Sequence, residues 1–271
     1  MLTRTLRRFS SFTNHFRSAA WSVPSPEKQN TPPDDAYFAN DRAMAVADGI
    51  SGWKQMGVDP SKYAWELMQN VSKSIVSLPD KLKFEPQAVL KDATKNTKET
   101  GSSTCTLAIF DPELSKLYTA NIGDSGFMIY RKKGEEVELI ARSQDVIHSF
   151  NSPCQLGTDG DSPDIASYEV IEVQDKDLIV MYTDGLTQNM FDDQILRMIK
   201  PFMLLHEIPD LEIIAEMVAE RALEHSTDTK FESPYMLKAK SEKIEWVGGK
   251  PNDITVLVGQ INLKEIKPIE V

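Results

Sequence analysis

Three apolar, strand-like runs of this chain end in an aspartate that stands beside a glycine. They are Met44-Ala45-Val46-Ala47-Asp48-Gly49, Ala120-Asn121-Ile122-Gly123-Asp124 and Val180-Met181-Tyr182-Thr183-Asp184-Gly185. An acid at a strand end lies where the sheet meets water, and the glycine lets the backbone turn sharply or approach a ligand. If such carboxylates converge on one point, they repel each other unless cations lie between them. Oxygen-rich sites of this kind suit Mg²⁺ or Mn²⁺ rather than zinc, so the pattern predicts a carboxylate-held metal centre.

The net charge of −11 is distributed unevenly along the chain. Residues 1–26 carry four arginines and no acid, and subtracting this +4 from −11 leaves −15 for residues 27–271. Non-specific nucleic-acid binding needs clustered Lys and Arg, so a body this acidic is not expected to bind nucleic acid.

Residues 1–20 are rich in Arg, Ser and Thr and contain no acid, which is the composition of a mitochondrial transit peptide. Leu2, Leu6, Phe9 and Phe16 fall on one face of a helix drawn through them. We therefore expect a transit peptide over residues 1–20, outside the fold, and a folded domain over residues 21–265. The alternative is a disordered basic tail. No apolar stretch approaches the roughly 18 residues of a membrane span, so none is expected.

The hydrophobic pattern places helices and strands in separate stretches of the chain. Helices are predicted over 64–78, 87–98, 192–199 and 211–222, and strands over 103–110, 116–122, 126–131, 137–142, 168–173, 177–183 and 254–261. The four strands between 103 and 142 have short connections, which predicts an antiparallel meander. Residues 151–167 are polar and aperiodic and are expected to be a surface excursion with substrate contacts. This order predicts a segregated α+β domain.

A lone Asp-Gly pair is most often a turn, but this chain also has the pair Asp34-Asp35 and a late Asn252-Asp253. One carboxylate that bridges two metals about 3.5–4 Å apart lets both polarise a shared water, which then yields hydroxide near neutral pH. Such a site needs no protein nucleophile. None of the four histidines stands beside a serine or cysteine motif, and Cys105 and Cys154 have no metal-ligand spacing. A Gly-rich phosphate loop and an HExxH zinc helix are also missing from the sequence.

With these residues in view, the chain resembles the protein phosphatase 2C (PPM) family of metal-dependent Ser/Thr phosphatases, and its mitochondrial branch most closely. The resemblance covers about residues 20–262 and rests on six motifs in order. They are 34–38 (DDAYF), 46–53 (VADGISGW), 101–104 (GSST), 120–126 (ANIGDSG), 183–186 (TDGL) and 248–256 (GGKPNDITV). It implies a β-sandwich of two antiparallel sheets flanked by pairs of α-helices, with a binuclear metal site at one end of the sandwich.

The resemblance also implies roles for individual residues. Asp48 would bridge two Mg²⁺ or Mn²⁺ ions, Gly49 would offer its carbonyl to one of them, and Asp184 would bind the other. Asp34 and Asp35 would hold metal-bound water, and Asp124 would serve a third, weaker ion. The catalytic set is then Asp48, Asp184 and Asp35, and the excursion at 151–167 would be the variable flap of the family.

Three positions depart from the family pattern. Asp34 replaces a glutamate, and Ile50 replaces the histidine often assigned as general acid. Asn252 stands at a metal-ligand position where the family has aspartate, and Coulomb's law makes the loss of one carboxylate worth several kcal/mol before compensation. Weaker metal binding is expected unless Asp253 substitutes. No arginine matches the phosphate-orienting residue of some relatives, and Lys28 is interpreted as a surface charge.

The resemblance implies a phosphatase of the mitochondrial matrix that hydrolyses phosphoserine and phosphothreonine in mitochondrial proteins. We expect it to be a monomer. A second hypothesis is a pseudophosphatase, a regulatory binding module whose metal loading is impaired by Asn252. A third, a Ca²⁺-stabilised structural β-protein, is disfavoured because the acids are spread from Asp34 to Asp253 and no twelve-residue calcium loop is present.

Overall fold

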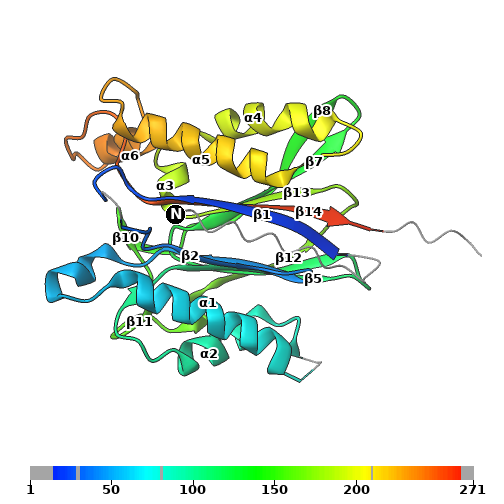
Figure 1. Ribbon diagram of the computed structural model, residues 1–271, viewed down its shortest axis with the longest axis horizontal. Coiled ribbons are helices and arrows are strands. Elements are labelled where there is room, and N and C mark those ends of the chain that lie inside the picture. Colours follow the sequence, from blue (N-terminus) through cyan, green and yellow to red (C-terminus); the bar gives the residue numbers. More distant parts are fainter. Residues whose placement is uncertain (1–14, 29–30, 80–81, 209, 264–271) are drawn as a thin grey trace, which may run out of the picture.

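The computed structural model describes residues 15–28, 31–79, 82–208 and 210–263. Two five-stranded antiparallel sheets pack face to face, and helices cover both outer surfaces (Figure 1). Sheet I has the order β1 (His15–Val23), β14 (Ile254–Asn262), β13 (Leu178–Tyr182), β7 (Gly126–Lys133) and β8 (Glu136–Arg142). Sheet II has the order β12 (Ser167–Glu172), β6 (Lys116–Ile122), β5 (Cys105–Asp111), β3 (Ala43–Ala47) and β2 (Ala36–Ala39). The predicted α+β sandwich is confirmed.

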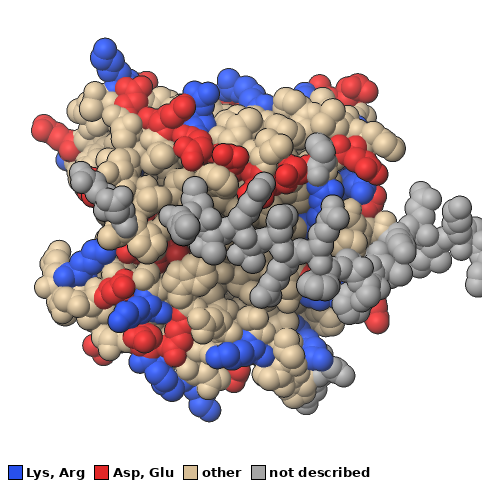
Figure 2. Space-filling model, viewed as in Figure 1, with Lys and Arg blue, Asp and Glu red and all other residues tan. Residues whose placement is uncertain are grey.

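Each sheet carries a pair of helices on its outer face. Helices α1 (Pro60–Ser77) and α2 (Pro86–Asn96) cover sheet II, and α4 (Asp192–Leu204) and α5 (Leu211–Thr227) cover sheet I (Figure 1). The start of α1 follows from its sequence, because Asp59 caps the helix by accepting from the Ser61 N–H at 3.1 Å and Pro60 occupies the first turn. On the face shown in Figure 2, acidic and basic side chains are interspersed over both helical layers.

Strand β13 is apolar throughout because both of its faces are buried. Its alternate residues Leu178, Val180 and Tyr182 join the core under α4 and α5, while Ile179 and Met181 join the core between the sheets. This two-residue alternation is the geometry of a strand between two layers. The core between the sheets also contains Phe16, Met44, Val46, Phe110, Phe127, Ile129 and Leu257.

The predicted meander is wrong, although its strands are nearly where the pattern placed them. Strands β5 and β6 pair within sheet II and β7 and β8 pair within sheet I, so the chain crosses between the sheets after β6. The crossing is made by Gly123, Asp124 and Ser125. Gly123 has φ +100°, a conformation that favours glycine, and a side chain there would collide with Thr104.

The predicted boundary at residue 20 falls inside a strand, and the start of the fold is corrected accordingly. His15–Val23 form β1 and pair with β14 over nine residue positions. Phe16, which the sequence pattern placed on a helical face, is 3% exposed, and its ring centroid lies 5.4 Å from that of Phe110. Residues 1–14 of the predicted transit peptide and residues 264–265 of the predicted domain lie outside the described residues.

Several short elements at one end of the sandwich were not predicted. They are α3 (Asp184–Thr187), α6 (Pro234–Ser241), β4 (Ser102–Ser103), β9 (Ile147–Ser149), β10 (Ser152–Pro153), β11 (Leu156–Gly157) and the 3₁₀ turns at Ser51–Met56 and Pro163–Ile165. Residues 143–166, between β8 and β12, form the surface segment that we call the flap, which begins before the predicted residue 151. Across the described ranges, none of the helices combines the length and apolarity of a membrane span.

Candidate metal centre

The predicted acids are delivered to one end of the sandwich by strands of both sheets. In sheet II, Asp35 directly precedes β2 and Asp48 directly follows β3, and the pairing of Ala36 with Ala47 brings these two strand ends together. In sheet I, Asp184 follows β13 and Asp253 precedes β14, whose ends meet through the pairing of Tyr182 with Val256.

The crossing between the sheets adds Asp124 to the same end. Its pKa is raised by burial and by the charge of Asp184, which places these two carboxylates within electrostatic reach of each other. We call Asp34, Asp35, Asp48, Asp124 and Asp184, together with Asn252, the acid centre.

The electrostatics of three carboxylates show how closely the acids gather. Burial raises the pKa of Asp48 well above its ordinary value, and the charges of Asp184, Asp35 and Asp124 raise it further. Burial, followed by the charge of Asp253, raises the pKa of Asp35 to about 8, although hydrogen bonds from Thr183 and Thr255 oppose this. Burial and Asp184 raise the pKa of Asp124 to about 7. Like charges removed from water account for all three shifts.

Two carboxylate oxygens of the acid centre are candidate metal ligands. Oδ1 of Asp35 and Oδ1 of Asp124 are buried, and neither has a hydrogen-bond partner among the described residues. The other Asp35 oxygen accepts a hydrogen bond from the Thr183 hydroxyl at 2.7 Å, which fixes the orientation of the carboxylate. Buried oxygens without partners are costly, and a cation would satisfy both. An all-oxygen donor set fits Mg²⁺ or Mn²⁺.

The motif Gly101–Thr104 holds the loop that carries Asp48. The Thr104 hydroxyl accepts from the Asp48 N–H at 3.0 Å, and the Thr104 N–H donates to the Asp48 carbonyl at 3.0 Å. Thr104 Oγ1 also lies 2.6 Å from the Ser125 hydroxyl, next to Asp124. Gly49 is required because a Cβ there would lie 2.7 Å from the carbonyl oxygens of both Asp34 and Pro60.

Asn252 lies directly beside Asp184, with its amide nitrogen toward that carboxylate. Its Nδ2 donates to Asp184 Oδ1 at 2.7 Å and to Gln188 Oε1 at 3.2 Å, while its Oδ1 accepts from the Asp253 N–H at 2.9 Å. Gln188 Nε2 donates to the other Asp184 oxygen. Gln188 was not predicted from the sequence, and its signal is its position four residues after Asp184, at the C-cap of the short helix α3.

Asp253 is engaged as an anchor for the N-terminal connector and does not replace Asn252 as a ligand in this arrangement. Its Oδ1 accepts from the Ser25 N–H at 2.7 Å, and its Oδ2 accepts from the Asp34 N–H at 2.7 Å and from Lys28 Nζ. Asp253 is 5% exposed, so these bonds are formed out of water.

Lys28 is not a surface charge, contrary to its interpretation from the sequence. Its ammonium group bridges Asp253 and Asp34, 2.7 Å from Asp34 Oδ2, with a side chain 15% exposed. Burial lowers the pKa of Lys28, but its two acidic partners outweigh this and leave the pKa raised. Lys54 also lies 2.7 Å from Asp34 Oδ2, so two lysines neutralise this corner of the acid centre.

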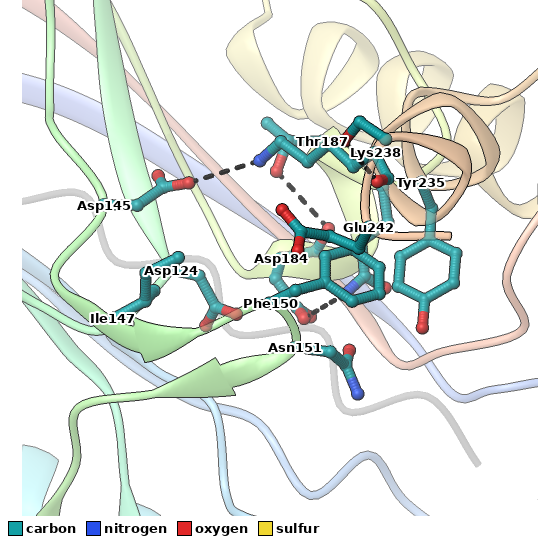
Figure 3. A pocket seen from close by; sticks show the side chains of 12 residues that line it. Asp124, Asp145, Ile147, Phe150, Asn151, Asp184, Thr187, Tyr235, Lys238 and Glu242 are labelled. Atoms are coloured by element: carbon teal, nitrogen blue, oxygen red, sulfur yellow. Dashed lines mark hydrogen bonds and ion pairs between the residues drawn. The ribbon is translucent and has the colours of Figure 1, made fainter. Parts of the chain in front are cut away.

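A pocket of about 260 Å³ opens beside Asp124 and Asp184, between the flap and α6 (Figure 3). The flap lines it with Asp145, Ile147, Phe150 and Asn151, and α6 with its C-cap residue lines it with Tyr235, Lys238, Ser241 and Glu242. The rings of Phe150 and Tyr235 lie side by side, with centroids 5.2 Å apart (Figure 3). The volume is below the roughly 300–1,000 Å³ of small-molecule sites and suits one or two side chains.

Lys250 ties the two walls of this pocket together. Its Nζ donates to Asn151 Oδ1 at 2.6 Å and lies 4.5 Å from the centroid of the Tyr235 ring. Because Lys250 stands two residues before Asn252, the loop that carries the amide of the acid centre also contacts the flap. Of the predicted excursion 151–167, only Asn151 lines the pocket, and the other flap contributors precede it.

Comparisons with known proteins agree on one family. A family model described as stage II sporulation protein E (SpoIIE) matches residues 63–231. The probable protein phosphatase 2C 26 of Arabidopsis thaliana is 34% identical over 256 residues, which cover 89% of this chain and 82% of that protein. The protein phosphatase PTC7 homolog fig of Drosophila mojavensis is 33% identical over 251 residues, covering 86% of this chain and 79% of that protein.

Solved structures extend the agreement to three dimensions. The X-ray structure of the photosystem II phosphatase PBCP is similar with a TM-score of 0.81 and 30% identity, covering 92% of this chain and all of the other. The catalytic domain of the serine/threonine phosphatase PstP in complex with two manganese ions has a TM-score of 0.60 at 20% identity, covering 92% of this chain and all of the other. At that identity the second likeness concerns the fold alone.

Proposed function

The chain belongs to the protein phosphatase 2C (PPM) family of metal-dependent Ser/Thr phosphatases, and we propose that it removes phosphate from phosphoserine and phosphothreonine of mitochondrial proteins with two Mg²⁺ or Mn²⁺ ions. The observation that carries the proposal is the gathering of carboxylates from both sheets around two buried, unpartnered oxygens, those of Asp35 and Asp124. The adjoining pocket gives a peptide access to this point.

We infer the following division of roles within the acid centre. Asp48 would contribute to holding both cations, together with Asp184 and the Gly49 carbonyl. The Asn252 oxygen would join them once the amide turns away from the Asp253 N–H that it now accepts from. When bound, the cations would neutralise the phosphoryl oxygens and lower the pKa of an attacking water. Asp34 and Asp35 would orient that water from the other side, and Asp124 would serve a third, weaker ion.

The protein contributes orientation that the cations alone cannot provide. Hydrogen bonds from Thr183 to Asp35 and between Thr104 and the Asp48 loop fix these two acids. Lys28 and Lys54 each form an ion pair with Asp34 and hold it in place. A phosphoserine entering between the flap and α6 would place its neighbouring residues against Phe150 and Tyr235. Preorganised polar groups that need no rearrangement during reaction are the main source of such rate enhancement.

The mitochondrial location is a proposal that rests on sequence. It is supported by the acid-free, arginine-containing composition of residues 1–14, which precede β1, and by the resemblance of the motifs to the mitochondrial branch of the family. The matrix is the compartment we propose, and phosphorylated matrix proteins are the substrates.

The proposal is tested by metal-dependent hydrolysis of p-nitrophenyl phosphate. We expect Asp48→Asn and Asp184→Asn each to reduce the rate at low Mn²⁺ at least about 100-fold, the scale on which loss of one charge-stabilising group acts. Asp193→Asn, which changes a carboxylate on the exposed face of α4, is the matched control and should retain the wild-type rate. A wild-type rate in either acid-centre variant, or hydrolysis that survives a chelator, would refute the mechanism.

The pseudophosphatase hypothesis is the less favoured alternative. Asn252 removes one charge, but Asp35, Asp48, Asp124 and Asp184 remain. The raised pKa values of Asp35, Asp48 and Asp124 and the unpartnered oxygens of Asp35 and Asp124 keep the demand for a cation high. We therefore propose weakened metal binding rather than lost catalysis.

A further inference from the structure

A second group of metal-ligating side chains lies in the flap, apart from the acid centre. A ring nitrogen of His148, the sulfur of Cys154 and a carboxylate oxygen of Asp161 all lie within 4.8 Å of one another. His148 belongs to β9, Cys154 directly follows β10, and Asp161 lies between β11 and the 3₁₀ turn at Pro163–Ile165. The group therefore joins three successive parts of one surface segment.

A tetrahedral zinc site needs its ligand atoms closer together than the 4.8 Å limit within which these three lie. Bonds of about 2.3 Å to sulfur and 2.0–2.2 Å to nitrogen and oxygen put neighbouring ligand atoms about 3.3–3.6 Å apart. His148 Nε2 already lies 3.0 Å from Asp161 Oδ2, so small shifts would complete the geometry. His148 is exposed, which leaves its ring free to adjust.

The other two ligands are held in place by the backbone of the flap. The Gln155 N–H donates to Asp161 Oδ2 at 2.9 Å, and the Cys154 N–H donates to the Val146 carbonyl at 3.1 Å. A site with two fixed ligands and one exposed, movable ligand has both preorganisation and an entry path for the ion.

The chemistry of this group differs from that of the acid centre. One nitrogen, one sulfur and one oxygen suit zinc, whereas Mg²⁺ prefers oxygen ligands alone. A cation placed between thiolate and carboxylate would remove their mutual repulsion.

We propose that the flap binds one Zn²⁺ through His148, Cys154 and Asp161, with water in the fourth position. Zn²⁺ binding would cross-link the flap, whose residues Ile147, Phe150 and Asn151 line the pocket beside Asp184. The Cys154 carbonyl also lies 3.1 Å from where a Cβ of Gly123 would be, next to Asp124, so the zinc-bound flap would be held against the crossing between the sheets.

The test uses Co²⁺ as a spectroscopic probe in protein saturated with Mg²⁺. Co²⁺ bound to a thiolate gives a near-ultraviolet charge-transfer band, which carboxylate and amide ligands of the acid centre cannot produce. We expect one equivalent of Co²⁺ to generate this band and one equivalent of Zn²⁺ to abolish it. Because the readout is not phosphatase activity, failure of this proposal and failure of the proposed function are distinguishable.

Variants assign the band to individual ligands. Cys154→Ser should abolish it, and His148→Gln should weaken Co²⁺ binding at least about 100-fold, the upper end of what loss of an outer-shell partner alone costs. His206→Gln changes another exposed histidine, one outside the flap, and should bind like the wild type. No band in the wild type, an equal band in Cys154→Ser, or unchanged affinity in His148→Gln would each overturn the proposal.

Discussion

Asn252 brings an uncharged amide to a centre otherwise built from carboxylates. In the structure this amide donates to Asp184 at 2.7 Å, an interaction that satisfies the carboxylate when no cation is bound. An aspartate at the same place would repel Asp184 instead. Asn252 therefore weakens metal binding and stabilises the metal-free protein.

Replacing Asn252 with aspartate should therefore tighten Mn²⁺ binding. We expect Asn252→Asp to lower the dissociation constant about 10- to 100-fold, or about 1.4–2.8 kcal/mol, because a partly buried charge next to a divalent ion is worth this much even at moderate effective dielectric. Calorimetric titration with Mn²⁺ measures the change.

The matched control is Asn262→Asp, which adds the same charge at the C-terminal end of β14, the opposite end of that strand from Asn252. It should leave Mn²⁺ binding unaltered. Equal affinities of wild type and Asn252→Asp would contradict the assignment of Asn252 as a ligand, and negligible binding by the wild type alone would favour the pseudophosphatase.

Single residues also mark what the sequence could and could not predict about the site. Asp48, Asp124 and Asp184 were predictable because an acid at the end of an apolar strand can be recognised from the sequence pattern alone. The engagement of Asp253 by Ser25, Lys28 and Asp34 was not, because these contacts join residues 219 to 228 positions apart. Such partners depend on the register of two sheets, which no local pattern encodes.

Among the elements, β1 contributes more strand pairing to sheet I than its sequence indicates. It pairs with β14 at nine positions, and a chain that began at the predicted boundary, residue 21, would lose the six pairs of residues 15–20. The strand went unrecognised because its arginine and serines interrupt the apolar alternation and match the composition of a targeting segment.

Phe16 tests the contribution of β1 to stability. We expect Phe16→Ala to lower the free energy of unfolding by about 3–5 kcal/mol, because it removes a fully packed aromatic ring from the core between the sheets. Urea denaturation of the metal-free protein measures the change. Leu114→Ala, at a leucine that is 58% exposed, should change it by less than about 0.5 kcal/mol, and a similar small effect at Phe16 would show that β1 is dispensable.

The crossing between β6 and β7 shows the limit of prediction at this scale. Both strands have clear apolar patterns, and their bounds were nearly right. Their assignment to different sheets depends on the positive φ of Gly123 and on packing against Thr104, and a short connection looks the same in sequence whether it closes a hairpin or crosses a sandwich.

For the whole molecule, the acid centre makes stability depend on pH. The folded-state pKa values of Asp35, about 8, and Asp124, about 7, lie above the ordinary carboxyl value, so the folded protein binds more protons than the unfolded chain. This contribution to stability is fully present below about pH 4 and is lost as the pH rises through these folded-state values.

We therefore expect the metal-free protein to be more stable at about pH 6 than at about pH 8. Saturating Mn²⁺ should reduce this difference, because the cation takes over the neutralising role of the protons. Denaturation in chelator and in Mn²⁺ at both pH values provides the comparison. Equal stabilities of the metal-free protein at the two pH values would mean that the carboxylates do not interact in the folded state.

The place of β14 in sheet I has a consequence for how the protein is made. This strand is the last in the described chain, yet it lies between β1, the first strand, and β13. During synthesis an unfilled gap therefore separates β1 from β13 until β14, residues 254–262, emerges from the ribosome. We therefore expect metal binding and phosphatase activity to begin only once translation has passed this point.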